Sequence, residues 1–127
     1  MQETKDFINT LSKEIYQANK AKGFWEDRTE LPQLGSLTGE ESIVLEKAFN
    51  AQMLALIHSE ISEALEADRK DLMDDKLPHR KGLEVELADT MIRIFDMAGG
   101  LGIDLGGALT DKLEYNTSRA YKHGKQY

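Results

Sequence analysis

The sequence has no cysteine and contains only two prolines and one tryptophan among its 127 residues. Without cysteine the chain can form no disulfide and no thiolate metal site, and we expect it to work in a reducing cytoplasm. No apolar run approaches the roughly 18 residues that suggest a membrane helix. Residues 1–6 lack the basic segment and following apolar run of a secretory signal. These absences predict a cytoplasmic globular protein.

Positive charge is also scarce, with 16 basic against 23 acidic residues and a net charge of −7. A general binder of nucleic-acid polymers needs a basic surface, so this composition argues against that class. A nucleotide substrate remains compatible, because acidic residues that hold Mg²⁺ can receive a polyphosphate through the metal. The alternative is that the acidic charge only keeps the chain in solution.

Apolar residues recur at three- and four-residue steps along most of the chain, a spacing typical of amphipathic helices. Thr38 and Glu41 have the spacing of a capping box, the glycines of residues 99–102 are expected to end a helix, and Asp104 to cap the next. The predicted helices cover about residues 2–21, 38–73, 82–98 and 104–122, separated by an irregular segment at 23–39 and a polar linker at 74–80. The sequence therefore predicts one all-α domain over residues 1–127, a bundle of four to five helices.

The second predicted helix is too long for a domain of this size. Unbroken, its roughly 33 residues would span about 50 Å, more than the width of a compact chain of this length. Either this helix breaks near Asn50, or it packs on another subunit. We favour a homo-oligomer.

Two pairs of acidic residues lie within the second and third predicted helices. Glu60 and Glu63, like Glu86 and Asp89, are three residues apart, so each pair lies on one side of a helical turn. Glu60 falls among apolar positions, where an ionised carboxylate needs a cation or a proton. If the two helices pack antiparallel, the four carboxylates converge, and hard oxygen ligands suit Mg²⁺ or Mn²⁺.

The alternative for these acids is two solvated edges on unrelated faces, and the acidic pattern alone does not decide between the two. A di-iron bundle is a further rival, but it needs Glu-x-x-His pairs. The nearby His58 points away from Glu60 by about 200° on a helical wheel.

A basic stripe follows on the last predicted helix. Lys112, Asn116 and Arg119 fall at i, i+4 and i+7 and span about 10 Å, the length of a polyphosphate. Arginine offers phosphate a planar fork, and lysine a point charge. Cations are favoured near helix C-termini in any case, so the stripe alone would be a solvated face. Beside an acidic metal cluster it predicts a phosphate clamp.

Taken in order, these motifs resemble the signature of the all-α NTP pyrophosphohydrolase superfamily, which includes the MazG-like enzymes, the dimeric dUTPases and the dCTP pyrophosphatases. The chain has E-x-x-E, 22 intervening residues, E-x-x-D and then K-x-x-x-N-x-x-R, within about residues 50–122. The resemblance implies a Mg²⁺-dependent house-cleaning hydrolase, with Mn²⁺ as a substitute, that converts (d)NTPs to (d)NMPs and pyrophosphate. It also implies a homodimer or homotetramer.

The resemblance further implies a role for each motif residue. Four acids would hold the metal, and one of them could also orient the attacking water. Two cations would bind phosphates, and the amide would hydrogen-bond a phosphate or sugar oxygen. The acids are Glu60, Glu63, Glu86 and Asp89, the cations are Lys112 and Arg119, and the amide is that of Asn116.

Base recognition is less defined in the sequence. Trp25, with Phe24 beside it, is a candidate for stacking on the nucleobase, but it could equally be a core residue. Asn50 could face the same pocket, whereas residues 26–38 carry no motif. A narrow dUTPase-like or dCTPase-like enzyme, a phosphoribosyl-ATP hydrolase, a silent nucleotide-binding module and a metal-free helical dimer remain alternatives. The presence of all four acids favours an enzyme.

Overall fold

The computed structural model describes the backbone of residues 1–127 and every side chain except that of Leu34. Helices dominate, and the described residues form no strand beyond an isolated bridge between Met73 and Lys81. The expected all-α fold is confirmed. The helices are α1 (Gln2–Ala21), α2 (Glu26–Glu30), α3 (Gly39–Arg69), α4 (Gly82–Leu101) and α5 (Leu105–Thr117), with short 3₁₀ helices at Leu31–Leu34 and Tyr121–Gly124.

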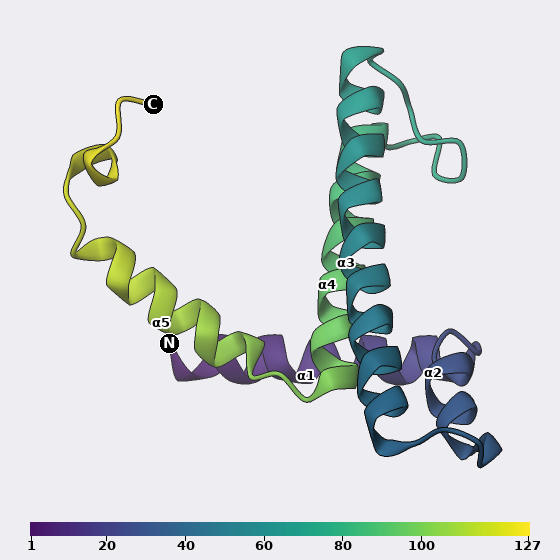
Figure 1. Cartoon of the computed structure of the whole chain (residues 1–127). Coiled ribbons are helices and arrows are strands. Elements are labelled where there is room, and N and C mark those ends of the chain that lie inside the picture. The colour runs from purple at the N-terminus through teal and green to yellow at the C-terminus, as the bar shows by residue number, and fades with distance from the viewer.

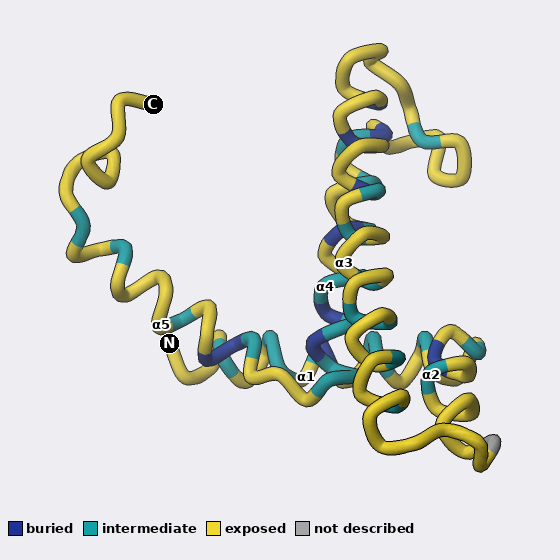
Figure 2. Tube along the Cα trace, viewed as in Figure 1, coloured by how far each residue is buried: buried dark blue, intermediate teal, exposed yellow. Residues whose placement is uncertain are grey.

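α3 and α4 lie side by side as a hairpin, and α1 crosses this hairpin at the end where α3 begins and α4 ends (Figure 1). α5 packs against α1 and then extends away from the hairpin (Figure 1). Buried residues follow the α3–α4 contact and the crossing of α4 with α1, whereas the outer side of α3 is exposed (Figure 2). None of the described helices combines the length and apolar character that a bilayer crossing requires.

Two predicted helix starts are confirmed. α1 covers residues 2–21 as expected. The capping box at the start of α3 is present, because the Thr38 hydroxyl accepts from the Glu41 amide and the Glu41 carboxylate accepts from the Thr38 amide.

α3 does not break near Asn50 but runs unbroken for 31 residues, about 46 Å at the usual helical rise. It ends at Arg69, earlier than the predicted residue 73, and Asp71 then takes a positive φ of 50° as the chain turns.

The glycine run at residues 99–102 ends the third helix as predicted, but at Leu101 and not at residue 98. α4 continues through Gly99 and Gly100 and stops at Leu101, where Gly102 takes the left-handed conformation. A Cβ on Gly99 would lie 2.2 Å from the Ser12 carbonyl oxygen, and one on Gly100 would lie 2.2 Å from the Trp25 ring. These glycines therefore allow close packing of α4 on α1 and on Trp25.

α5 is capped as predicted, with the Asp104 side chain accepting from the Gly107 amide, but it ends at Thr117 instead of residue 122. The hydroxyls of Thr117 and Ser118 bond back to the carbonyls of the preceding turn. Arg119 lies beyond the helix end, and the predicted i, i+4, i+7 line is correct only for its first two members.

The segment at residues 23–39, predicted to be irregular, contains α2 and the first 3₁₀ helix. Trp25 stands at the N-terminal end of α2. This short helix places Trp25 and Arg28 against the α3–α4 hairpin, where both border the cavity described below.

Candidate metal centre and adjoining cavity

The α3–α4 hairpin brings three of the predicted acids together. Glu60 and Glu63 from α3 and Glu86 from α4 each offer a carboxylate oxygen, and these oxygens lie within 4.8 Å of one another. Glu60 is only 8 % exposed, Glu86 is half-buried and Glu63 is exposed. We call these three residues the acidic cluster. Asp89, half-buried and one turn beyond Glu86, borders the cluster from α4.

The acidic cluster is electrostatically strained. Burial, followed by the charge of Glu63 and contact with Glu60, raises the pKa of Glu86 from 4.5 to about 7. Burial and then the charge of Glu60 also raise the pKa of Asp89, while Arg93 acts in the opposite direction. The carboxyl groups raise one another's pKa although Arg93 is paired with Glu60, and a divalent cation would supply further positive charge.

One oxygen in the cluster has no partner at all. Glu86 Oε2 is buried and accepts no hydrogen bond from any described group. Buried polar atoms are normally paired, and a bound cation is one way to satisfy this oxygen. Three carboxylates with no sulfur or imidazole form a hard donor set that fits Mg²⁺ or Mn²⁺. The residues present therefore fit the metal that the resemblance implies.

Arg93 is a member of the site that the sequence analysis missed. It follows Asp89 by one turn of α4, and its Nε donates to Glu60 Oε1 at 2.5 Å. The i, i+4 spacing of Asp89 and Arg93 was the available signal. Since an i, i+4 pair is common on solvated helices, this spacing alone could not reveal that Arg93 reaches across to α3.

A cavity of about 490 Å³ begins beside Glu60 and Asp89 and extends along the hairpin to Trp25. Its volume lies within the usual range for small-molecule sites. The wall mixes aromatic and aliphatic side chains with polar groups of both charges. It is formed by Asn19, Phe24, Trp25, Asp27, Arg28, Phe49, Gln52, Met53, Leu56, Glu60, Asp89, Ile92, Arg93 and Asp96.

Trp25 belongs to the core and also borders this cavity. Only 5 % of the residue is exposed. Its Nε1 donates to Asp96 Oδ1 at 2.9 Å, and its ring meets that of Tyr16 edge-on with 5.0 Å between centroids. Both interpretations of Trp25 thus retain support, since a buried ring can present one edge to a ligand. The neighbouring Phe24 is 76 % exposed and lines the cavity mouth.

Asn50 is engaged by Arg28. The Arg28 guanidinium donates to Asn50 Oδ1 at 2.6 Å and lies 5.5 Å from the Trp25 ring centre and 5.8 Å from that of Phe49. Asn50 itself is not among the cavity-lining residues. Asn50 therefore does not face the cavity as predicted. It orients Arg28, which lines the cavity.

The basic residues near the C-terminus are not brought to the acidic cluster within one chain. α5 packs on α1 and extends away from the hairpin (Figure 1). Lys112 and Arg119 instead lie over the Tyr115 ring, at 4.7 Å and 5.8 Å from its centre. Asn116 Oδ1 is buried with no hydrogen-bond partner among the described groups.

No protein-family model, curated protein or solved structure matches this chain. The resemblance to the all-α pyrophosphohydrolases therefore depends on the motif residues themselves. What the structure adds is the position of each motif, with the acids together on the hairpin and the basic residues apart on and after α5.

Proposed function

We propose that this protein is a Mg²⁺-dependent nucleoside triphosphate pyrophosphohydrolase that converts (d)NTPs to (d)NMPs and pyrophosphate. The observation that supports this most strongly is the meeting of Glu60, Glu63 and Glu86 within 4.8 Å, beside a cavity of about 490 Å³. The unpartnered oxygen of Glu86 supports a cation there. All four acids of the predicted motif are present, which favours an enzyme over a silent binding module.

In this proposal the three cluster residues and Asp89 hold the metal. The bound ion would neutralise charge that develops on the phosphoryl group and on the departing pyrophosphate. Because Glu63 is the most exposed cluster member, it is our candidate to orient the attacking water while also binding the metal. Glu60 and Glu86, held by surrounding side chains, would fix the position of the ion.

We place the nucleoside in the cavity beyond the metal. Phe49, Leu56 and Ile92 offer apolar contact to a planar base, and Asp96 and Gln52 offer hydrogen bonds. Arg28, oriented by Asn50 and by two aromatic rings, adds a cation at the far end. This wall has both donors and acceptors, which suits a nucleobase in general and does not single out one base.

We also propose that the protein works as a homo-oligomer. The chain exposes 9543 Å², whereas a compact monomer of 14.3 kDa exposes about 6,800 Å². The difference, roughly 2,700 Å² per chain or about 5,400 Å² for a dimer, lies at the upper end of what obligate subunit interfaces bury. Large apolar side chains are exposed along both hairpin helices, namely Leu54, Ile61, Leu65, Leu87 and Met91. In such an assembly the basic residues of one copy could lie near the acids of another.

The deciding experiment is a pyrophosphate-release assay against all ribonucleoside and deoxyribonucleoside triphosphates, with Mg²⁺ and with EDTA. We expect monophosphate and pyrophosphate only when Mg²⁺ is present. The substrate ranking distinguishes a broad enzyme from a dUTPase-like or dCTPase-like one. If a folded sample binds nucleotide without turnover, the protein is a binding module and the proposal fails.

Arg119→Ala tests the phosphate role of the C-terminal basic residues. We expect a weaker apparent affinity for nucleotide, by about tenfold for one charge-assisted phosphate contact, with the melting temperature unchanged. Sedimentation of the same sample establishes whether the assembly is intact. Unchanged KM and kcat would remove Arg119 from the site.

A further inference from the structure

The ion pair between Arg93 and Glu60 joins a fixed acid to an accessible cation. Glu60 is the most buried member of the acidic cluster, so its side chain has little open space around it. The Arg93 side chain is 41 % exposed and lies on the cavity wall. Of the two groups, therefore, the guanidinium has more room to change its position.

The guanidinium occupies one oxygen of a carboxylate that would also bind the metal. Arg93 Nε contacts Glu60 Oε1, and the carboxylate of Glu60 also faces Glu86 within the cluster. A divalent cation among these oxygens would lie a few ångströms from the guanidinium. Two positive groups at that separation repel one another, and the repulsion is stronger in a half-buried site than in water. Binding of the cation and retention of the pair oppose each other.

The cavity offers the released guanidinium a second partner. Arg93 lines it together with Asp89, Asp96 and Arg28. Arg28 already pairs with Glu46 at 3.3 Å, so Arg93 is the cation that an anion in the cavity would meet beside the acidic cluster. The planar fork of an arginine matches the oxygens of a phosphate group and can bind two of them at once.

We propose that Arg93 exchanges partners, neutralising Glu60 in the metal-free chain and turning to the phosphate of the ligand once Glu60 takes up a divalent cation. This inference rests on the proposed function, because it requires a cation at the acidic cluster. The exchange would couple phosphate binding to cation binding. Phosphate draws Arg93 away from Glu60, and the freed carboxylate then binds the cation more tightly. By thermodynamic linkage the cation favours phosphate by the same factor.

The first test is Arg93→Gln, followed by calorimetric titration with Mg²⁺ alone. Removing the competing guanidinium should tighten Mg²⁺ binding by about fivefold or more, the lower end of typical coupling between sites. Arg69→Gln removes the same charge from the exposed end of α3 and should change the affinity less than twofold. Arg93→Lys keeps the charge and should return the affinity most of the way to that of the unaltered protein.

A second test changes Glu60 in place of Arg93 and is carried out without metal. Glu60→Gln should release Arg93, so that inorganic phosphate binds to the protein in EDTA several-fold more tightly. Glu63→Gln removes an equal charge without freeing Arg93 and should give a smaller gain. The gain should vanish in the double variant Glu60→Gln/Arg93→Gln. If Arg93→Gln is too unstable to titrate, the comparison of phosphate binding by Glu60→Gln and Glu63→Gln still tests the exchange.

The outcomes separate this inference from the proposed function. If the unaltered protein binds Mg²⁺ and releases pyrophosphate, but Arg93→Gln binds Mg²⁺ no more tightly, the partner exchange is wrong and the enzyme assignment stands. Equal phosphate gains in Glu60→Gln and Glu63→Gln would also overturn the exchange. If the unaltered protein binds no Mg²⁺, both proposals fail.

Discussion

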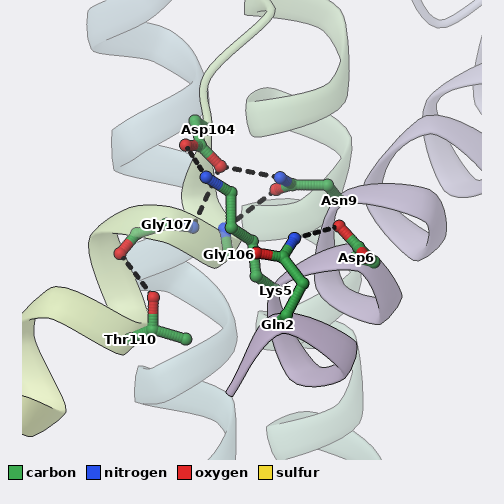
Figure 3. A network of polar contacts seen from close by, with 8 residues as sticks. All are labelled: Gln2, Lys5, Asp6, Asn9, Asp104, Gly106, Gly107 and Thr110. Carbon is green, nitrogen blue, oxygen red and sulfur yellow. Dashed lines mark hydrogen bonds and ion pairs between the residues drawn. The ribbon is translucent and has the colours of Figure 1, made fainter.

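Two carboxylate centres in this protein have opposite electrostatics. Asp104, at the start of α5, is exposed but surrounded by donors, with Asn9 Nδ2 at 2.7 Å, the Gly107 amide at 2.9 Å and Lys5 Nζ at 3.0 Å (Figure 3). These hydrogen bonds, that of Asn9 first, lower its pKa to about 2. Glu86, in the acidic cluster, is half-buried among other acids, and its pKa rises to about 7.

The difference separates an acid that is fully paired within the chain from one that is not. Asp104 has its partners within the chain and ties α5 to α1. Close packing supports the tie, because the Gly106 amide donates to Asn9 Oδ1 at 2.9 Å and a Cβ on Gly106 would lie 2.3 Å from the Lys5 carbonyl oxygen (Figure 3). Glu86 has an oxygen without any donor. Both centres contain carboxyl groups, and they differ in whether hydrogen-bond donors surround the carboxylate.

The largest expected contrast is in activity. Glu63→Gln should reduce Mg²⁺-dependent pyrophosphate release by about 100-fold or more, because a charged metal ligand is lost. The melting temperature in EDTA should stay the same or rise, since one repelling charge is gone. Glu66→Gln, an equal charge change one turn along α3, is the control. Near-normal turnover of Glu63→Gln would exclude Glu63 from metal binding.

Removing Asp104 should lower the stability of the protein and leave its activity nearly unchanged. Asp104→Ala deletes a helix N-cap and a link between α1 and α5, so the melting temperature should fall by several degrees with or without Mg²⁺. Turnover per folded molecule should change less than twofold. Asp111→Ala, an exposed acid on the same helix, controls for the lost charge. A loss of turnover as deep as that of Glu63→Gln would mean that the two centres do not differ as described.

Glu86 and Asp104 should also make the stability of the protein depend on pH in opposite directions when EDTA is present. The pKa of Glu86 in the folded chain lies above its usual 4.5, so the folded state holds a proton more tightly than the unfolded state. Stability should therefore fall as the pH rises from about 4.5 through 7. Glu86→Gln should flatten this slope, and Mg²⁺ should reverse it by favouring the ionised acid. Thermal melts at several pH values, with Glu84→Gln as control, measure the effect.

Asp104 should behave in the opposite sense. Its pKa in the folded chain lies below its usual 3.8, so its contribution is present above that value and is lost as the pH falls toward 2. The difference in melting temperature between the unaltered protein and Asp104→Asn should be constant from pH 8 to 5 and shrink only in strong acid. A difference that disappears near pH 6 would contradict the lowered pKa.

The smallest expected effect belongs to Lys5. Its ion pair with Asp104 is exposed, and such pairs add little in water, so Lys5→Met should lower the melting temperature by at most about a degree. Asn9→Ala should lower it more, because Asn9 both donates to Asp104 and accepts from Gly106. The reverse order would show that charge, and not hydrogen bonding, holds this centre together.

Local features of the chain were largely predictable. The span of α1, the capping box at Thr38 and the cap at Asp104 follow from short-range patterns, and all three are confirmed. The glycines at 99 and 100 were misinterpreted because their role depends on Ser12 and Trp25, which are distant in sequence. The early end of α5 was missed because no glycine or proline, the usual stop signals, follows Thr117 before residue 124.

By itself the sequence determined the helical periodicity, the caps and the pairing of acids on single turns, because these depend on residues three or four apart. Only the tertiary structure decided which pairs meet. It joined Glu60, Glu63 and Glu86 across the hairpin, placed Arg93 on Glu60, and directed α5 with its basic residues away from them. Such contacts depend on how whole helices cross, and helix crossing is set by packing over many residues at once.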